Sequence, residues 1–266
     1  MPELPDVEGF KRYLARHASG RRIERVDVRA ADIVRNTSAS GLARAVSGRR
    51  LARPRRHGKW MIVPLDATSD ERGPALLFHF GMTGGLRWAA SRREAPHPHD
   101  RVIFHLRGGE LRYRNMRKLG GIWLARSGQS LAEITGPLGP DAQSLSRGDL
   151  EHLLGRRRGG LKATLMNQRA IAGIGNELSD EILWQARLNP RRRVSTLRGR
   201  DLDRLHRRMH DVIATSNRHG LIPRKRGWIS SQRGVRDPRC PRCRRGLRRE
   251  TVAGRTAYWC PRCQRG

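Results

Sequence analysis

The sequence predicts an α+β protein of several domains. A helix and a β-rich domain come first, a mostly helical segment follows, and a cysteine module ends the chain. Three observations support this prediction: an amphipathic stripe near the N-terminus, a later series of short apolar runs, and four cysteines confined to the last 27 residues. A chain of 266 residues is long enough for more than one ordinary domain.

The first 126 residues change pattern once. Residues 4–18 are predicted to form a helix, because apolar side chains recur on one stripe at Val7, Phe10 and Leu14. Pro5 suits the first turn of this helix and Gly20 suits its end. From residue 23 to about residue 126, short apolar runs alternate with Gly, Pro and charged residues, as at 60–63, 75–78 and 101–104. Such runs predict a β-rich domain, which we interpret as a β-sandwich.

The middle of the chain is predicted to be helical. Residues 136–140 read Gly-Pro-Leu-Gly-Pro, which is typical of a linker. Ser146 can then cap a helix that carries Leu150, Leu153 and Leu154, and a longer helix is predicted over residues 200–218, ended by Gly220. We place the domains at residues 1–132, 146–222 and 236–266, with a linker at 133–145.

The four cysteines predict a zinc ribbon. They form two pairs separated by 16 residues, Cys240-x2-Cys243 and Cys260-x2-Cys263, which is the spacing of a tetrahedral zinc site. Two disulfides or four free thiols are the alternative, which the absence of an export signal disfavours. Four thiolates leave no open position for water, so we expect one structural Zn²⁺ and no catalytic metal.

The charge predicts a polyanionic partner. The chain has 56 Lys and Arg against 24 Asp and Glu, a formal net charge of +32, which attracts nucleic acid in the first instance. No apolar run is long enough to span a membrane, and the start of the chain does not resemble a secretory signal. We therefore expect a cytoplasmic, nucleoid-associated protein.

The N-terminus offers a candidate nucleophile. Removal of Met1 exposes the secondary amine of Pro2, and an α-amino group is unprotonated at neutral pH far more often than a lysine. Such an amine can attack C1′ of a sugar and form a Schiff base, and Glu3 beside it can transfer the protons. Many chains begin with Pro-Glu for structural reasons alone, so this pair needs support from other motifs.

A hairpin in the cysteine module offers a candidate phosphate contact. Residues 252–258 read as two short strands joined by a Gly-Arg turn, which would present Arg255 to a phosphate. An ordinary solvated arginine is the alternative.

Five ordered motifs resemble those of the formamidopyrimidine-DNA glycosylase family, which includes endonuclease VIII. They lie at residues 1–8 (Met-Pro-Glu-Leu-Pro-Asp-Val-Glu), 55–60 (Arg-Arg-His-Gly-Lys-Trp), 79–84 (His-Phe-Gly-Met-Thr-Gly), 172–177 (Ala-Gly-Ile-Gly-Asn-Glu) and 254–256 (Gly-Arg-Thr). The resemblance covers nearly the whole chain. It implies a catalytic N-terminal β-sandwich, a helix-two-turn-helix DNA-binding domain and a zinc finger.

The resemblance also implies the activity and the catalytic residues. The family comprises bifunctional base-excision repair enzymes, hydrolases of N-glycosyl bonds with abasic-site lyase activity, which remove oxidised bases and nick the strand by β,δ-elimination. Pro2 would be the Schiff-base nucleophile and Glu3 the general acid or base. Lys59 and Arg255 would contact the phosphates beside the lesion, as would Asn176, which we expect to cap the helix at residues 177–186.

Further residues would fill the space that a flipped base leaves. Met82, Arg117 and Leu119 match the family's wedge positions, although Met82 could equally be a core methionine. Residues 115–119 read Asn-Met-Arg-Lys-Leu where the family has Asp-Pro-Arg-Arg-Phe, so an aliphatic side chain replaces the aromatic one. Asp6 and Asn167 also depart from the family's usual Glu and Asp, and the loop after Gly220 lacks the family's lesion-closing sequence.

These observations lead to one main hypothesis and two alternatives. The main one is a monomeric glycosylase and lyase acting on double-stranded DNA that carries damaged bases or abasic sites, with no membrane or small-molecule cofactor involved. The Glu-Leu-Pro start favours oxidised purines such as 8-oxoguanine and formamidopyrimidines over oxidised pyrimidines. The altered wedge motivates a non-catalytic DNA-binding or damage-sensing paralogue. A zinc-ribbon protein acting on RNA would explain only the charge and the cysteines.

Overall fold

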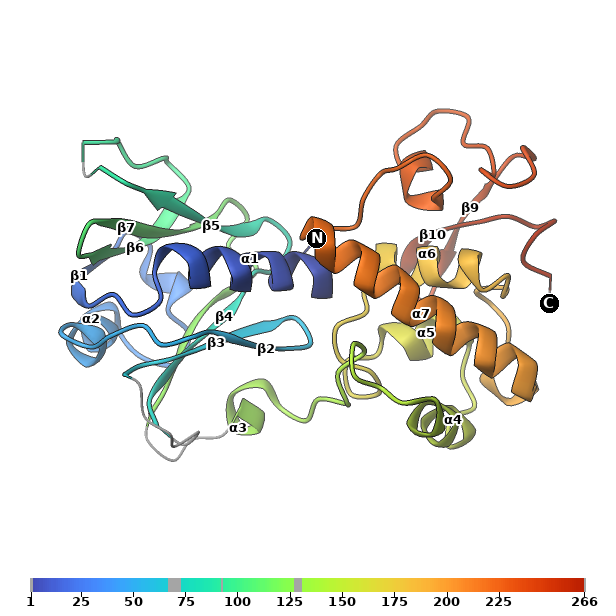
Figure 1. The fold of residues 1–266 in the computed structure, drawn as a ribbon, viewed down its shortest axis with the longest axis horizontal. Coiled ribbons are helices and arrows are strands. Elements are labelled where there is room, and N and C mark those ends of the chain that lie inside the picture. The colour runs from blue at the N-terminus through green and yellow to red at the C-terminus, as the bar shows by residue number, and fades with distance from the viewer. Residues whose placement is uncertain (1, 67–72, 92, 127–130, 266) are drawn as a thin grey trace. The chain divides into compact units, whose positions relative to one another are not determined.

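The computed structural model describes residues 2–66, 73–91, 93–126 and 131–265 (Figure 1). The chain divides into two compact units. The first contains Pro2 and Asp6–Pro137, and the second contains Glu3–Pro5 and Leu138–Gly266. The boundary at Pro137 falls within the predicted linker. None of the helices in the described ranges has both the length and the apolar character that a membrane span requires.

The first unit is a β-sandwich preceded by a helix, as predicted. Helix α1 (Leu4–His17) comes first, followed by β1 (Ile23–Val28), η1 (Ala31–Ile33) and α2 (Ala39–Val46). The remaining elements are β2 (Arg55–His57), β3 (Trp60–Pro64), β4 (Ala75–His79), β5 (Gly84–Ala89), β6 (Asp100–Leu106), β7 (Gly109–Asn115), β8 (Gly121–Ala125) and α3 (Leu131–Thr135). They form two antiparallel four-stranded sheets of order β1-β6-β7-β5 and β2-β3-β4-β8.

Both sheets and α1 contribute to one core in this unit. Phe78 of β4, Phe104 of β6 and Tyr113 of β7 are almost fully buried in it, and the centre of the Phe78 ring lies 6.2 Å from that of Phe104 and 6.0 Å from that of Tyr113. The predicted stripe of α1 faces this core, since Val7 and Leu14 are fully buried. A helix of this length depends on such burial, because an isolated one is marginal in water.

The second unit combines short helices with the cysteine hairpin. Its elements are α4 (Arg147–Gly155), α5 (Leu161–Met166), α6 (Asn176–Gln185), η2 (Val194–Thr196), α7 (Gly199–His219), η3 (Ile229–Gln232), β9 (Arg248–Val252) and β10 (Arg255–Trp259). Ser146 caps α4 by accepting a hydrogen bond from Asp149 N, and Gly220 ends α7 in the left-handed region at φ 68°. Both helix boundaries agree with the sequence signals.

Candidate functional site

Glu3 lies in a site made by the backbone at the start of α6. Its side chain is 1% exposed, and its two carboxylate oxygens accept three backbone N–H groups, from Gly175 at 2.9 Å, Glu177 at 2.9 Å and Leu178 at 3.0 Å. The first turn of a helix leaves such donors without intrahelical partners. The partial positive charge of the helix N-terminus also favours an anion there, so this site suits an ionised carboxylate.

Two glycines allow Glu3 and Leu4 to come this close. A Cβ at Gly175 would overlap the Glu3 carboxyl carbon, and a Cβ at Gly173 would lie 2.7 Å from Leu4 Cδ1. Gly173 also has φ 110°, and its carbonyl accepts a hydrogen bond from Leu4 N at 3.1 Å. The Gly-Ile-Gly sequence is therefore explained by close approach of the N-terminal segment.

Asn176 has a different place from the predicted one. The N-cap of α6 is Gly175, and Asn176 is the first helical residue. The prediction that Asn176 caps the helix is wrong, because the Glu3 side chain takes the backbone donors that a cap would satisfy. The Asn176 side chain instead donates to the Thr256 carbonyl at 3.0 Å, which connects α6 to the cysteine hairpin.

Arg255 lies beside that connection. The two central turn residues of the hairpin are Ala253 and Gly254, with φ 52° and 70°, so Arg255 is the first residue of β10 and not part of the turn. The predicted Gly-Arg turn is thus shifted by one residue, because a two-residue hairpin turn needs two positive φ angles. Arg255 is exposed, as a residue that contacts a partner must be.

A buried ionic network supports this part of the site. Lys162 is fully buried, pairs with Asp180 and donates to the Asn176 carbonyl at 3.2 Å. Asp180 also pairs with Arg233 and accepts from Tyr258 N at 3.0 Å. Sequence reasoning missed this network. The one available signal was Lys162 in a largely apolar segment at residues 161–166.

In the first unit, Lys59 lies in a tight hairpin turn. The β2–β3 register pairs His57 with Trp60, which places Gly58 (φ 56°) and Lys59 at the tip. Burial and the charge of Lys59 lower the pKa of nearby His79 to about 4. A neutral His79 agrees with its hydrogen bond, since Nδ1 accepts from Gly81 N at 3.3 Å.

The three wedge candidates lie on two loops of the first unit that are joined through Thr83 and Asn115. The Thr83 hydroxyl accepts from Arg117 N at 3.0 Å and donates to Asn115 Oδ1 at 3.0 Å. Arg117 Nη1 also lies 3.4 Å from the Met82 sulfur. Met82 is half-buried in its turn and lies outside the core clusters, while Leu119 is 53% exposed.

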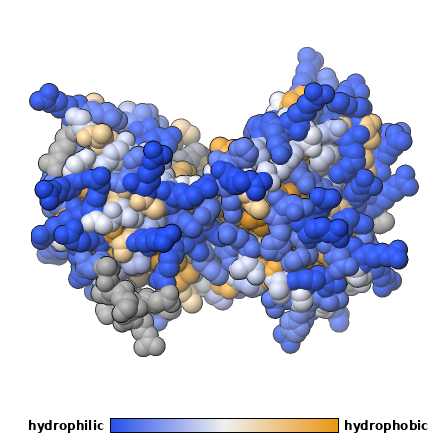
Figure 2. All heavy atoms as spheres, in the orientation of Figure 1, coloured by the Kyte–Doolittle hydropathy of each residue, from blue (hydrophilic) through white to orange (hydrophobic). Residues whose placement is uncertain are grey.

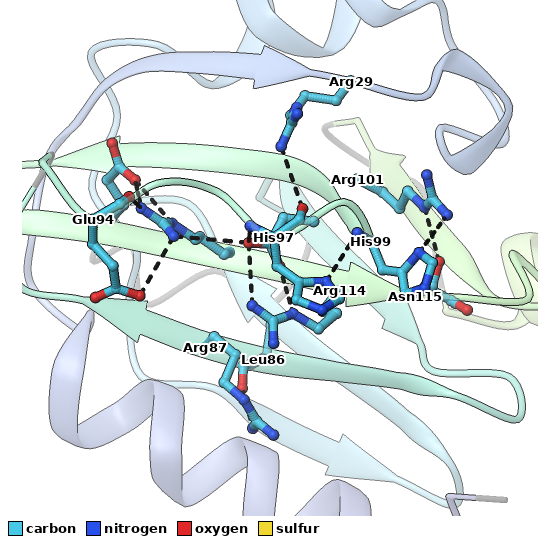
Figure 3. A network of polar contacts seen from close by, with 12 residues as sticks. Arg29, Leu86, Arg87, Glu94, His97, His99, Arg101, Arg114 and Asn115 are labelled. Atoms are coloured by element: carbon cyan, nitrogen blue, oxygen red, sulfur yellow. Dashed lines mark hydrogen bonds and ion pairs between the residues drawn. The ribbon is translucent and has the colours of Figure 1, made fainter.

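Asn115, which precedes Arg117 and Leu119 in the chain, belongs to a network of polar contacts (Figure 3). Asp100, which is 1% exposed, accepts from Arg114 at 2.7 Å and from His97 N at 2.9 Å. These hydrogen bonds hold the pKa of Asp100 below its ordinary value although burial acts in the opposite direction. Arg101 donates to the Asn115 carbonyl at 2.9 Å. Asn115 is thereby held through its backbone carbonyl by Arg101 and through its side chain by Thr83.

The four cysteines come together as a metal site. Their sulfurs all lie within 4.8 Å of one another, with Cys240 and Cys263 3.9 Å apart and Cys243 and Cys260 3.5 Å apart. Four sulfurs around zinc at about 2.3 Å would be about 3.8 Å apart in a tetrahedron. The donor set and its spacing therefore fit Zn²⁺, and the site is structural because thiolates fill all four positions.

Three family models match the chain in succession. The formamidopyrimidine-DNA glycosylase N-terminal domain matches residues 1–122, the H2TH domain of the same enzymes matches residues 138–222, and a zinc finger found in FPG and IleRS matches residues 238–266. The formamidopyrimidine-DNA glycosylase of Pelotomaculum thermopropionicum is 32% identical over 282 residues, which cover 100% of this chain and 99% of the relative. The chain belongs to the formamidopyrimidine-DNA glycosylase family.

Other family members support the same assignment. The Heliobacterium modesticaldum formamidopyrimidine-DNA glycosylase is 34% identical over the full length of both chains. Lactococcus lactis Fpg, solved with DNA containing N7-benzyl-Fapy-dG, is 25% identical and superposes with a TM-score of 0.88 over 100% of both chains. The predicted family, fold class and zinc ribbon are confirmed. The predicted enzyme class, a DNA repair glycosylase with lyase activity, is that of the family.

Proposed function

We propose that this chain excises oxidised bases from double-stranded DNA through a Schiff base on Pro2 and then nicks the strand by β,δ-elimination. The observation that carries the proposal is the Glu3 carboxylate, buried and held by three backbone N–H groups directly after Pro2 in the chain. A group held this firmly is suited to proton transfer, since catalysis requires fixed geometry.

The proposed covalent step uses the terminal amine. After removal of Met1, the Pro2 nitrogen attacks C1′ with its lone pair, and the base departs with the electrons of the glycosidic bond and takes up a proton. The Pro2 nitrogen then loses its N–H proton to Glu3, which restores the lone pair that the next step needs. The C1′–O4′ bond then opens, O4′ takes up a proton and an iminium forms between C1′ and Pro2. Loss of a C2′ proton expels the 3′ phosphate, and loss of a C4′ proton expels the 5′ phosphate.

Glu3 is proposed to be the base in these transfers. An ionised carboxylate has no proton to give at the start, and its two oxygens already accept three N–H groups. It can therefore receive a proton from the sugar and return it later in the cycle. The general-acid role left open by the sequence is the less suitable of the two for this environment.

The DNA contacts are proposed to come from both units. Lys59, Asn176 and Arg255 would bind phosphates near the lesion, and Met82, Arg117 and Leu119 would occupy the space left by the extruded nucleotide. The chemistry of these side chains favours DNA as the partner, because cations and amide N–H groups bind phosphates. The phosphate candidates are two cations and an amide that already contacts the hairpin carrying Arg255. Lactococcus lactis Fpg has been solved with abasic-site DNA, which supports the same partner here.

Oxidised purines are the proposed substrates. The N-terminal Pro-Glu-Leu-Pro sequence and the family names of the relatives favour 8-oxoguanine and ring-opened guanine. We further propose that the enzyme acts as a monomer at the nucleoid and needs no small-molecule cofactor, because every step above is redox-neutral.

Borohydride trapping tests the proposal. Met1-processed protein is mixed with a duplex containing 8-oxoguanine opposite cytosine, and in parallel with an abasic-site duplex. A covalent adduct on both, mapped to Pro2 by mass spectrometry, is the expected result. The Pro2→Gly variant should lose base release, and Glu3→Gln should lose turnover, whereas Glu151→Gln, at an exposed position of α4, is the matched control.

Each other outcome has a distinct meaning. An adduct on the abasic duplex alone keeps the lyase chemistry and rejects 8-oxoguanine as the substrate. No adduct on either duplex, with DNA binding intact, rejects the catalytic proposal in favour of the non-catalytic DNA-binding alternative, which the aliphatic Leu119 motivates.

A further inference from the structure

We propose that the second unit has another DNA-backbone contact surface, a groove at the C-terminal end of α6 that is separate from the Glu3 site. We call it the arginine groove. It is lined by six arginines, Arg187, Arg204, Arg208, Arg242, Arg262 and Arg265. They come from the end of α6, from α7 and from the two cysteine loops, all within one unit.

The groove consists of two adjoining hollows of about 570 and 600 Å³. Both hollows are lined by Arg187 and Arg242, so the surface is continuous. None of the residues that line either hollow is an aspartate or a glutamate, the two cysteines of the second hollow, Cys243 and Cys263, are zinc ligands, and Trp184 and Trp228 form part of the wall of the first. A concave surface with one sign of charge concentrates the field and attracts counterions. Hydrophilic side chains are widespread on the face that Figure 2 shows, so hydrophilicity alone does not distinguish the groove. Arg204 and Arg208 pair with Asp201 and Asp211 of α7, whereas no ion pair is found for the other four arginines within the described part of the chain.

Several of these guanidinium groups are held in place. Arg204 donates to the Ala186 carbonyl, and Arg242 donates to the Trp184 carbonyl at 3.3 Å while stacking 4.3 Å from the Trp184 ring centre. These two arginines satisfy carbonyls at the end of α6, which is a structural role. Arg204 also donates to Asp201 at 2.8 Å, so Arg242 is the one of the two that keeps most of its five N–H groups for a ligand.

Arg187 and Arg262 have no such structural explanation. Both are exposed, and for neither does the described part of the chain record a side-chain hydrogen bond or ion pair. Arg187 follows the last turn of α6 with φ 55°, a left-handed position that usually favours glycine. Because an arginine stands at a position that favours glycine, and lies among other arginines, we infer that its side chain binds a phosphate.

The groove is distinct from the proposed lesion site. Glu3 and Asn176 lie at the first turn of α6, whereas Arg187 follows the last turn. The ten residues of the helix separate them by about 15 Å at 1.5 Å per residue. The same phosphate cannot therefore contact both places.

The geometry favours a phosphate chain over a single anion. The arginines follow one another across two hollows instead of converging on one point. The carbonyls at a helix C-terminus also disfavour an isolated anion, whereas a backbone can place its phosphates at the arginines. Duplex DNA carries such a row of phosphates, and binding it releases counterions for each phosphate that is neutralised.

The salt dependence of binding to undamaged DNA tests this inference. The zinc-loaded full chain is titrated with a labelled undamaged duplex at several sodium chloride concentrations, and binding is followed by fluorescence anisotropy. The double variant Arg187→Gln/Arg262→Gln should reduce the slope of log K against log salt by about 1.8, at about 0.9 for each phosphate contact. Arg16→Gln/Arg44→Gln makes the same charge change at exposed sites in the first unit and should leave the slope unchanged.

The control separates a local contact from a general charge effect. Equal slopes for both double variants, whether reduced or not, would overturn the proposal. Melting temperature and zinc content show whether each variant is folded. Because the readout is binding to undamaged DNA, failure of the proposed base excision would leave this result interpretable.

Discussion

At the residue scale, the position of Glu3 depends on a residue distant in sequence. Glycine is the only residue type that leaves room for the Glu3 carboxyl group at position 175, since any Cβ there overlaps that group. The catalytic candidate could be predicted from its place after Pro2. Its three N–H partners could not, because nothing in the first eight residues points to residues 175–178.

Gly175→Ala should therefore reduce activity without changing any proposed catalytic side chain. Displacing the carboxylate by about 1 Å can cost roughly a hundredfold in rate. Loss of its buried hydrogen bonds should cost about 1–3 kcal/mol of unfolding free energy. Single-turnover base release and urea unfolding measure the two effects. Gly199→Ala, where an added Cβ meets open space, is the control. Equal rates for the two variants would show that the position of Glu3 does not matter.

His79 should make stability depend on pH. Its pKa is about 4 in the folded chain and about 6.5 when unfolded, so protons bind the unfolded state first as pH falls. The stabilisation is complete above about pH 6.5 and is lost as pH falls towards 4. The parent should lose about 2–3 kcal/mol of unfolding free energy through His79 when the pH falls from about 7.5 to 4.5. His79→Asn keeps an acceptor for Gly81 N but cannot bind this proton, so the variant should not show that loss. Parallel pH profiles for the variant and the parent would contradict this, and His152→Asn on α4 is the exposed control.

At the scale of elements, local signals explain what could be predicted. Helices α1 and α7 were predictable because their apolar periodicity and end residues are local features. The contacts that hold the site are not local. Asn115 is 32 residues from Thr83, and Asp180 is 53 residues from Arg233. These polar residues resemble ordinary surface residues until the fold brings them together.

Thr83 should control the wedge through two loops. The Thr83→Val change keeps the shape but removes the hydroxyl that joins Arg117 N to Asn115. Arg117 N then loses its acceptor, whereas Asn115 Oδ1 keeps the hydrogen bond from Lys118 N. We expect a loss of about 1–3 kcal/mol in stability and weaker discrimination between bases opposite the lesion. Excision rates against duplexes with each of the four opposite bases measure the discrimination. Thr251→Val, exposed on β9, is the control. An unchanged opposite-base preference would separate Thr83 from the wedge.

At the scale of the whole molecule, the cysteine hairpin is part of the second unit and not an independent appendage. Trp184 of α6 donates to the Cys240 sulfur at 3.4 Å, and Asp180 of α6 accepts from Tyr258 N of β10. The sequence predicted the zinc ligands from their spacing alone. It could not predict that α6 holds both Glu3 and the ribbon, because that depends on packing between residues 180–184 and 240–258.

Zinc removal should therefore affect DNA binding more than the β-sandwich. A small hairpin whose core includes the four cysteines has too little apolar surface to fold without its metal. Chelation should unfold β9 and β10, displace Arg255 and break the hydrogen bond between Asn176 and Thr256. Because phosphate contacts are then lost, affinity for an abasic-site duplex should fall at least about tenfold. Hydrogen exchange should show protection lost in β9 and β10 but kept in β6 and β7 of the first unit.

Cys243→Ser should reproduce the effect, and Ser231→Ala gives a nearby control that leaves the zinc ligands intact. Full protection of β9 and β10 after verified zinc removal would show that packing on α6, and not the metal, folds the ribbon.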